Sequence, residues 1–305
     1  MQTEIFKKSK KPNVFIVGAA KSGTTSLSEY LKLYSDVFVP EYKEPFFFID
    51  GFGVRDIKEY REVFSGHNDE KVIVDASTGY LFDKSVPQKI LDFNSDAKVV
   101  ILLRNPIDVA FSYWKYMRAN GHERLPFRDA ISPAVQKFRR TTNFYKTVTD
   151  WPPSYWYAAR AMYYGQVAEY IRLFGEKKVK VYIFEEFIKS DFLKQDLLSF
   201  LGVAYDDSIQ FLNENASGDV SRFFHFLRYS RVLRGVKSVS KKFVSKEKQI
   251  KIRKWMIKKS TKRKSSHVLS VTDRNHLKDI FIEDVKKLES LLGRPINWKD
   301  FNETS

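Results

Sequence analysis

The stretch VFIVGAAKSGTTSL, Val14 to Leu27, decides the fold and raises the question of function. Its first half is a short apolar run that ends at Gly18, which is typical of a buried strand in a parallel sheet. Its second half places small residues around Lys21 and leads into a helix pattern, SGTTSLSEYLKLY. Small residues let the backbone approach a ligand, and the unpaired amides of a helix start attract an anion. The sequence therefore predicts a phosphate or sulfate site at this loop.

The rest of the chain repeats this strand and helix alternation. Buried strands are predicted within residues 71–77, 97–106 and 178–187, and helices within 107–120 and 163–175. The alternation indicates an α/β fold: a P-loop-like, three-layer arrangement with a central, mostly parallel sheet flanked by helices. Residues 128–153 lack periodicity, and we expect an irregular, partly helical excursion over one face of the sheet. No linker divides the chain, so a single domain with insertions is predicted.

The composition excludes several classes of protein. A hydrophobic content of 43% excludes a disordered or fibrous chain. No apolar run approaches the roughly 20 residues that span a bilayer, and residues 1–13 lack the apolar centre of a secretory signal, so we expect a cytoplasmic protein. The absence of cysteine excludes disulfides and thiolate ligands, and the five histidines lack metal-ligand spacing. No metal site is predicted.

The loop at Lys21 resembles the nucleotide-binding pattern GxxxxGK[ST] but has a different order. Its lysine precedes the second glycine, Gly23, instead of following it. A P-loop kinase or NTPase is therefore disfavoured but stays open as an alternative. A plain strand-to-helix turn with a solvated lysine is the other alternative for this loop taken alone.

A second motif supports an anion site. KVVILLRNPIDVAFSYW places Arg104 at the end of a buried strand and Ser112 about two turns into the following helix. The carboxyl ends of strands are where open α/β sheets bind ligands. Arg104 is therefore a candidate for a second phosphate, with Ser112 adding a hydroxyl donor.

With these two elements the sequence resembles the sulfotransferases that use 3′-phosphoadenosine 5′-phosphosulfate (PAPS). KSGTTSL at 21–27 is similar to the family's 5′-phosphosulfate loop, and LLRNPIDVAFSYW at 102–114 to its 3′-phosphate element. The resemblance extends to 291–298, so the domain is expected to cover residues 13–305 after a basic tail at 1–12. It implies PAPS as co-substrate, adenosine 3′,5′-bisphosphate (PAP) as product, and no metal. The implied cofactor-binding residues are Lys21, Ser22, Gly23, Thr24, Thr25, Ser26, Arg104, Ser112, Phe184 and Arg222.

The resemblance also suggests the catalytic groups. In the glycan-modifying branch of the family, which YKEPFFF at 42–48 resembles, a glutamate just before an aromatic pair acts as the base, and here this is Glu44. A surface carboxylate paired with Lys43 is the alternative. Lys21 would neutralise the charge that develops on the bridging oxygen as the sulfuryl group leaves.

The acceptor is expected to be a hydroxyl of a carbohydrate or glycolipid. Candidate substrate-binding residues are Lys43, Phe47, Asp75 and Tyr80. The alternatives are that Asp75 caps a turn and that Phe184 belongs to the core. No lysine lies between Lys71 and Lys84, where glycan-modifying relatives often carry one. This departure argues against a heparan-like acceptor.

The positive charge of the chain is concentrated in one segment, residues 222–264. It contains 17 lysines and arginines against one acid, Glu247, so its net charge equals the +16 of the whole chain. A solvated face, peripheral binding at the inner, anionic membrane surface and binding of an acidic polysaccharide all stay open. Nucleic acid is disfavoured because no nucleic-acid fold accompanies the charge. A non-catalytic protein that binds membranes or polyanions is thus another alternative. A C-terminal amphipathic helix is predicted over 273–292.

Overall fold

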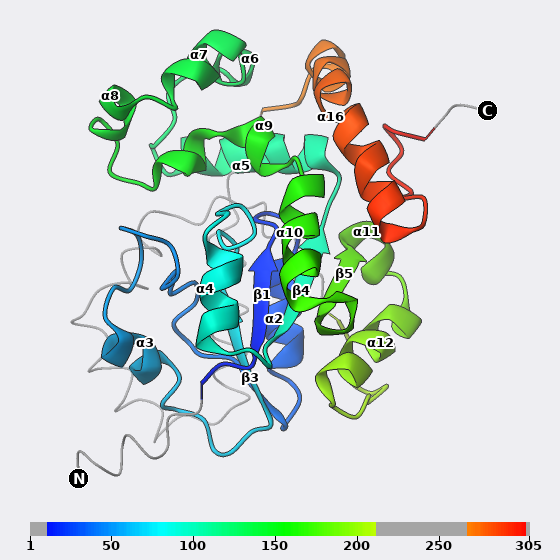
Figure 1. The fold of residues 1–305 in the computed structure, drawn as a ribbon. Coiled ribbons are helices and arrows are strands. Elements are labelled where there is room, and N and C mark those ends of the chain that lie inside the picture. Colours follow the sequence, from blue (N-terminus) through cyan, green and yellow to red (C-terminus); the bar gives the residue numbers. More distant parts are fainter. Residues whose placement is uncertain (1–10, 212–266, 303–305) are drawn as a thin grey trace.

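The computed structural model describes residues 11–211 and 267–302. Within them, five strands form one sheet in the order β2-β3-β1-β4-β5, and every neighbouring pair is parallel. The strands are β1 Val14–Gly18, β2 Val37–Phe38, β3 Val72–Ala76, β4 Lys98–Leu103 and β5 Val179–Ile183. The predicted α/β fold with a central parallel sheet is confirmed, and all carboxyl ends of the strands meet at one edge (Figure 1).

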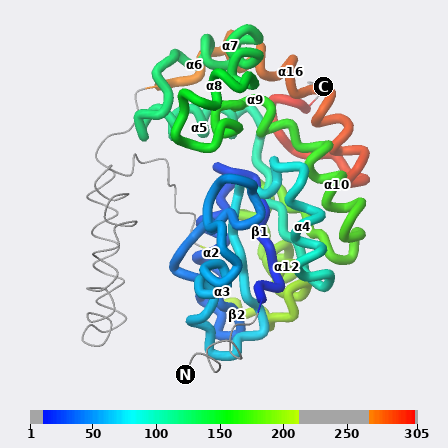
Figure 2. Tube along the Cα trace, turned by 60° about the vertical axis from the view of Figure 1, so that its left-hand side comes forward, coloured from blue at the N-terminus to red at the C-terminus, as the bar shows by residue number. Residues whose placement is uncertain are grey.

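Successive side chains of β1 point to opposite faces of the sheet and enter two different hydrophobic cores. Phe15 and Val17 belong to one cluster, and Val14 and Ile16 belong to the other. All four side chains are at most 1% exposed, because helices cover both faces of the sheet. Figure 2 shows helix α2 on one side of β1 and helices α4 and α10 on the other.

The helices fall into two layers and one group beyond the sheet. One layer contains α2 Thr24–Leu31 and α12 Asp191–Leu201. The other contains α3 Ile57–Val63, α4 Val86–Phe93 and α10 Tyr164–Phe174. Beyond the carboxyl ends of the strands lie α5 Pro106–Ala119 and α16 Val271–Leu292, which pack on the same hydrophobic cluster (Figure 1). The short elements are α6 Phe127–Ala130, α7 Pro133–Phe138, α8 Thr142–Tyr145, η1 Pro152–Tyr155, α9 Tyr157–Arg160, η2 Glu176–Lys178 and α11 Phe184–Phe187.

Two predicted elements differ from the structure. The run KVKVYIFEEF was predicted as one strand, but β5 ends at Ile183 and the next four residues form the short helix α11. Residues 128–153 do form the predicted irregular excursion, yet α6, α7 and α8 lie beyond the carboxyl ends of the strands, next to α5 and α9, and not over a face of the sheet (Figure 1).

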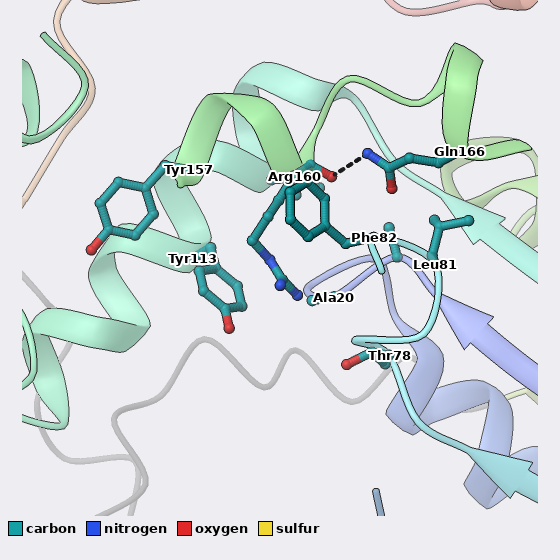
Figure 3. Close-up of a pocket in the computed structure, with 10 residues that line it drawn as sticks. Ala20, Thr78, Leu81, Phe82, Tyr113, Tyr157, Arg160 and Gln166 are labelled. Atoms are coloured by element: carbon teal, nitrogen blue, oxygen red, sulfur yellow. Dashed lines mark hydrogen bonds between the residues drawn. The ribbon is translucent and has the colours of Figure 1, made fainter. Parts of the chain in front are cut away.

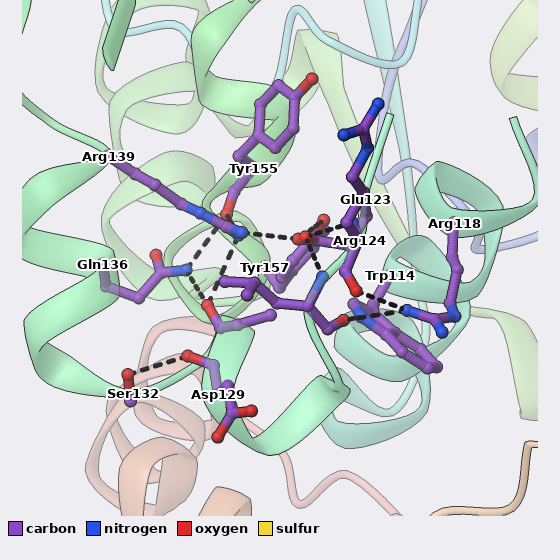
Figure 4. A network of polar contacts seen from close by, with 12 residues as sticks. Trp114, Arg118, Glu123, Arg124, Asp129, Ser132, Gln136, Arg139, Tyr155 and Tyr157 are labelled. Carbon is purple, nitrogen blue, oxygen red and sulfur yellow. Dashed lines mark hydrogen bonds and ion pairs between the residues drawn. The ribbon is translucent and has the colours of Figure 1, made fainter. Parts of the chain in front are cut away.

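A buried ion pair holds this excursion in place. Arg139 Nη2 lies 2.6 Å from Glu123 Oε2, and the same oxygen accepts a hydrogen bond of 2.8 Å from the Tyr157 hydroxyl. The other oxygen of Glu123 accepts from the backbone amides of Arg124 and Leu125. Both charged groups are at most 5% exposed, and each has its partner (Figure 4). The network thus joins the end of α5 to α7 and α9.

The chain end returns to the carboxyl edge of the sheet. Helix α16 begins at its cap Ser270, whose hydroxyl accepts from the amide of Asp273. Beyond the helix, Asp300 contacts Arg274 and Asn105, the residue after Arg104. The basic segment 222–264 with Arg222, and residues 1–10 of the basic tail, lie outside the described residues.

Candidate active site

The loop between β1 and α2 holds its shape through close backbone contacts. The amide of Ala19 donates to the carbonyl of Leu102 at 2.7 Å, which ties the loop to β4. A Cβ on Gly18 would lie 2.6 Å from Cβ of Leu81, so the strand must end in glycine here. Lys21 and Gly23 both have positive φ, 68° and 87°, and this turn directs the first amides of α2 toward the carboxyl edge of the sheet.

Gly23 is required for a second reason. A Cβ at this position would lie 2.2 Å from Cε2 of Phe184. The ring of Phe184 is buried in the core and covers the helix start. The predicted contact of Phe184 with the cofactor stays a prediction, and its packing against the loop is a structural role.

Lys21 is buried, and both negative and positive side chains act on its charge. Its Nζ is 5.1 Å from the centroid of the Tyr116 ring. Burial lowers the pKa of Lys21, the charge of Glu44 raises it, and the positive charges of Arg104 and Lys115 lower it. The charged neighbours of Lys21 therefore include one carboxylate and two cations, and a surplus of positive charge suits an anion site.

Arg104 lies beside this loop, as the sequence predicts. Its Nη1 donates to the carbonyl of Lys21 at 3.4 Å, and its guanidinium is 5.7 Å from the centroid of the Phe184 ring. Glu185 Oε1 is 3.9 Å from its Nε. One third of the side chain is exposed, so donors are left for an anion that approaches from solvent.

The hydroxyl residues of the loop differ in exposure. Ser22, Thr24 and Ser26 are buried and Thr25 is exposed, while Ser112 lies on α5, partly exposed. Among the described residues, Oγ of Ser22 has no hydrogen-bond partner. A buried hydroxyl without a hydrogen bond and the amides at the start of α2 fit the phosphosulfate of PAPS.

Tyr163 lies next to Ser22 at the base of the loop. Its hydroxyl donates to the carbonyl of Arg104 at 3.0 Å. Burial and the negative charge of Glu185 both raise the pKa of Tyr163. The tyrosine therefore stays protonated and joins the end of β4 to the phosphate loop.

Glu44 comes to this edge from the loop after β2. Its Oε1 accepts a hydrogen bond of 2.5 Å from the hydroxyl of Thr78, which follows β3. Its φ of 55° is positive, as is that of Phe46 at 50°. Because a Cβ on Gly18 would lie 3.2 Å from the carbonyl oxygen of Thr78, Thr78 places Glu44 at the loop that carries Lys21.

Backbone contacts hold the Glu44 loop in this unusual conformation. The amide of Phe46 donates to Oγ of Ser77 at 3.3 Å, and the amide of Val54 donates to the carbonyl of Pro45 at 2.8 Å. Gly53 packs so closely that a Cβ would lie 2.3 Å from that carbonyl oxygen. Two residues with positive φ are strained, and these contacts offset the strain.

Asp75 and Tyr80 do not fit the predicted contact with an acceptor. Both are fully buried, and Asp75 accepts hydrogen bonds from Tyr60, Ser77 and Tyr80 at 2.7, 2.7 and 3.1 Å. Burial raises the pKa of Asp75 to about 6, and the three hydrogen bonds lower it. Because Ser77 also holds the amide of Phe46, this network supports the Glu44 loop from beneath.

The other two predicted acceptor residues have partners within the protein. Nζ of Lys43 lies 2.9 Å from Glu29 Oε1, so Lys43 forms an ion pair with Glu29. The ring of Phe47 stacks on Tyr60 at 4.3 Å between centroids. Their contacts with an acceptor stay predictions.

A pocket adjoins this site and contains residues that the sequence analysis missed. Thr78, Tyr113 and Arg160 line it, together with Ala19 and Ala20 of the loop (Figure 3). Arg160 stands between aromatic residues in YWYAARAMYY, and a lone arginine in such a run is a signal of cation–π packing. Thr78 has no comparable signal.

The described ranges, 11–211 and 267–302, hold neither a metal cluster nor a membrane-spanning helix. No group of three or more His, Cys, Asp or Glu side chains there is arranged to hold a metal ion. No helix in the same part of the chain combines the length and apolar character needed to cross a membrane.

Known proteins share this fold and this sequence pattern. A sulfotransferase from Alicyclobacillus acidocaldarius is 28% identical, with a TM-score of 0.67 over 94% of this chain and 98% of that chain. Heparan sulfate glucosamine 3-O-sulfotransferase 6 of Homo sapiens is 32% identical over 127 residues, which are 40% of this chain and 36% of that protein. Membrane-associated sulfotransferase kil1 of Dictyostelium discoideum is 25% identical over 107 residues, 34% of this chain and 23% of that protein.

These sequence matches span about a third or less of each relative's length. The family described as "Sulfotransferase domain" matches residues 11–289, which is most of the chain and includes the loop, Glu44 and Arg104. The chain belongs to the sulfotransferase family.

Proposed function

We propose that this protein transfers a sulfuryl group from PAPS to a hydroxyl of an acceptor, by in-line displacement with Glu44 as the base. The observation that carries the proposal is that Thr78, which holds Glu44, packs against Gly18 of the loop that carries Lys21 and leads to the first amides of α2. The matched family supports PAPS as the donor.

The donor's two phosphate ends have separate candidate residues. The α2 amides, Ser22 and Lys21 would hold the 5′-phosphosulfate, since they supply hydrogen-bond donors and one positive charge. Arg104 and Ser112 would hold the 3′-phosphate, and Arg104 keeps exposed donors for it.

The proposed reaction moves one proton and one negative charge, and we give Glu44 the proton and Lys21 the charge. The acceptor oxygen forms a bond to sulfur, its proton passes to Glu44, and the bond between sulfur and the bridging phosphate oxygen breaks. Lys21 neutralises the negative charge that develops on that bridging oxygen. The hydrogen bond from Thr78 orients the carboxylate of Glu44 for the proton transfer.

The acceptor class rests on the relatives. One matched relative is named for a heparan sulfate glucosamine substrate. We infer a hydroxyl on a carbohydrate or glycolipid. For segment 222–264, peripheral binding to an anionic membrane or to an acidic polysaccharide remains a proposal from composition.

Binding of PAP tests the donor assignment directly. PAP should raise the melting temperature of the protein without added metal, and Arg104→Ala should weaken PAP binding about 10- to 100-fold, because charge-assisted hydrogen bonds are lost. Arg124→Ala, at an exposed arginine after α5, is the matched control and should bind PAP normally. Failure of PAP to bind, or magnesium-dependent binding of ATP that ignores the 3′-phosphate, would instead support the kinase alternative.

A further inference from the structure

Arg160 lies in the pocket that adjoins the proposed base. The pocket is lined by Ala19 and Ala20 of the phosphate loop and by Thr78, whose hydroxyl holds Glu44. Tyr113 of α5 and Arg160 of α9 also line it, and the Arg160 side chain extends toward Ala20 (Figure 3). A group in this pocket would therefore lie next to both the loop and Glu44.

The guanidinium of Arg160 is buried among aromatic rings. The residue is 8% exposed, and its guanidinium lies over the rings of Phe82, Tyr113 and Trp151, at 5.4, 4.8 and 5.0 Å from the centroids. Within the part of the chain that the structure describes, Nη1 makes no hydrogen bond. Aromatic faces attract the charge but do not accept its N–H donors in the plane of the guanidinium.

Arg139 provides a comparison within the same molecule. Its guanidinium also lies over three aromatic rings, including Tyr155 at 5.5 Å and Tyr157 at 5.6 Å, and it is 4% exposed. Its Nη2, however, meets the carboxylate of Glu123 at 2.6 Å (Figure 4). A buried charge is costly unless it is paired. Arg160 has the same aromatic setting as Arg139, but its Nη1 has no hydrogen-bond partner within residues 11–211 and 267–302.

We propose that the missing anion is an acidic group of the acceptor, a carboxylate or a sulfate ester, that binds Arg160 while a neighbouring hydroxyl lies at Glu44. This inference rests on the proposed function and names the acceptor class: an acidic carbohydrate. The geometry favours the acceptor over the donor, because Arg160 shares its pocket with Thr78, which holds Glu44, whereas Arg104, the candidate for the 3′-phosphate, lies over the ring of Phe184.

Binding of simple sugars to the PAP complex tests the proposal. Methyl glucuronide and glucose 6-sulfate are the acidic probes, and methyl glucoside is the neutral control, each titrated by NMR. We expect the acidic probes to bind wild-type protein about 10- to 100-fold more tightly than the neutral one. Arg160→Gln should remove this preference, and Arg160→Lys should retain part of it. Arg140→Gln, at an exposed arginine over Trp156, is the matched control and should keep the full preference.

Three results would overturn the proposal. One is equal affinity of wild-type protein for acidic and neutral probes, which needs no variant to fold. Another is an unchanged preference in Arg160→Gln. The third is an Arg160→Gln protein that binds PAP normally but PAPS weakly, since Arg160 would then contact the donor's sulfuryl group. PAP affinity, measured in the same samples, separates this outcome from failure of the proposed function, in which PAP itself would not bind.

Discussion

At the scale of single residues, the proposed role of Glu44 as the base can be tested separately from PAP binding. The Glu44 carboxylate accepts a hydrogen bond from Thr78 and raises the pKa of Lys21, and an ionised carboxylate has no donor to offer a phosphate. Glu44→Gln should therefore lower the turnover number at least ~100-fold, the range of a lost general base, while PAP affinity stays unchanged. Sulfation rate and PAP titration measure the two effects.

The control for this prediction is Glu41→Gln, at an exposed glutamate of the same loop, which should keep its rate. Full activity of Glu44→Gln would show that another group takes the proton. Loss of PAP binding in the same variant would show that the loop, and not the base, had been damaged.

Asp75 is buried, so its ionisation should make the stability of the protein depend on pH. Burial raises its pKa from 3.8 to about 6, so between these values the native state binds more protons than the unfolded state. The free energy of unfolding contributed by Asp75 therefore falls as pH rises through this window, by about 3 kcal/mol in total. Asp75→Asn should lose this dependence in urea titrations between about pH 4 and pH 7.

Asp50→Asn, at an exposed aspartate, is the control and should keep the wild-type dependence. An Asp75→Asn protein whose stability changes with pH as in the wild type would show that Asp75 is ionised normally in the fold. The network makes Asp75 a positioning residue for Ser77 and Phe46, so its substitution should also lower turnover more than PAP affinity.

At the scale of elements, the start of α2 depends on its contact with the residue after β5. Gly23→Ala meets two costs: a left-handed φ of 87° and a Cβ that overlaps the ring of Phe184. Gly202→Ala, at the end of α12 with a φ of 78° and nothing within 4 Å, meets only the first. We predict a loss of about 1 kcal/mol for Gly202→Ala and clearly more for Gly23→Ala, together with weaker PAP binding.

A double variant separates the two costs. Phe184→Ala should recover part of the stability of Gly23→Ala, because it removes the ring that the new methyl group overlaps. Additive losses in chemical denaturation would contradict the predicted contact between the loop and Phe184.

At the scale of the whole molecule, the parallel strands and the loop were predictable from local pattern. β1 is a continuous apolar run, and β3 and β4 are apolar apart from Asp75 and Lys98. Helix α5 begins where Asn105 caps it and Pro106 follows. Because parallel strands bring their carboxyl ends to one edge, Lys21 and Arg104 could be expected to meet there.

Other parts of the site could not be predicted, because they depend on contacts distant in sequence. An aspartate such as Asp75 can bind an acceptor, and the sequence alone does not show whether it is exposed. Its burial follows from the contacts that Tyr60 and Tyr80 make with it in the fold. Arg160 and Thr78 lie 82 positions apart and become neighbours through the fold. β5 ends early because Phe184 turns into α11 and packs on the loop.

Transfer of ³⁵S from labelled PAPS to a panel of glycan, glycolipid and phenolic acceptors measures the proposed activity most directly. We predict labelled product with a hydroxyl-bearing carbohydrate or glycolipid, formed without added metal and at least ~100-fold more slowly by Glu44→Gln. Protein that binds PAP yet labels no acceptor in the panel would contradict sulfuryl transfer to a hydroxyl by this site.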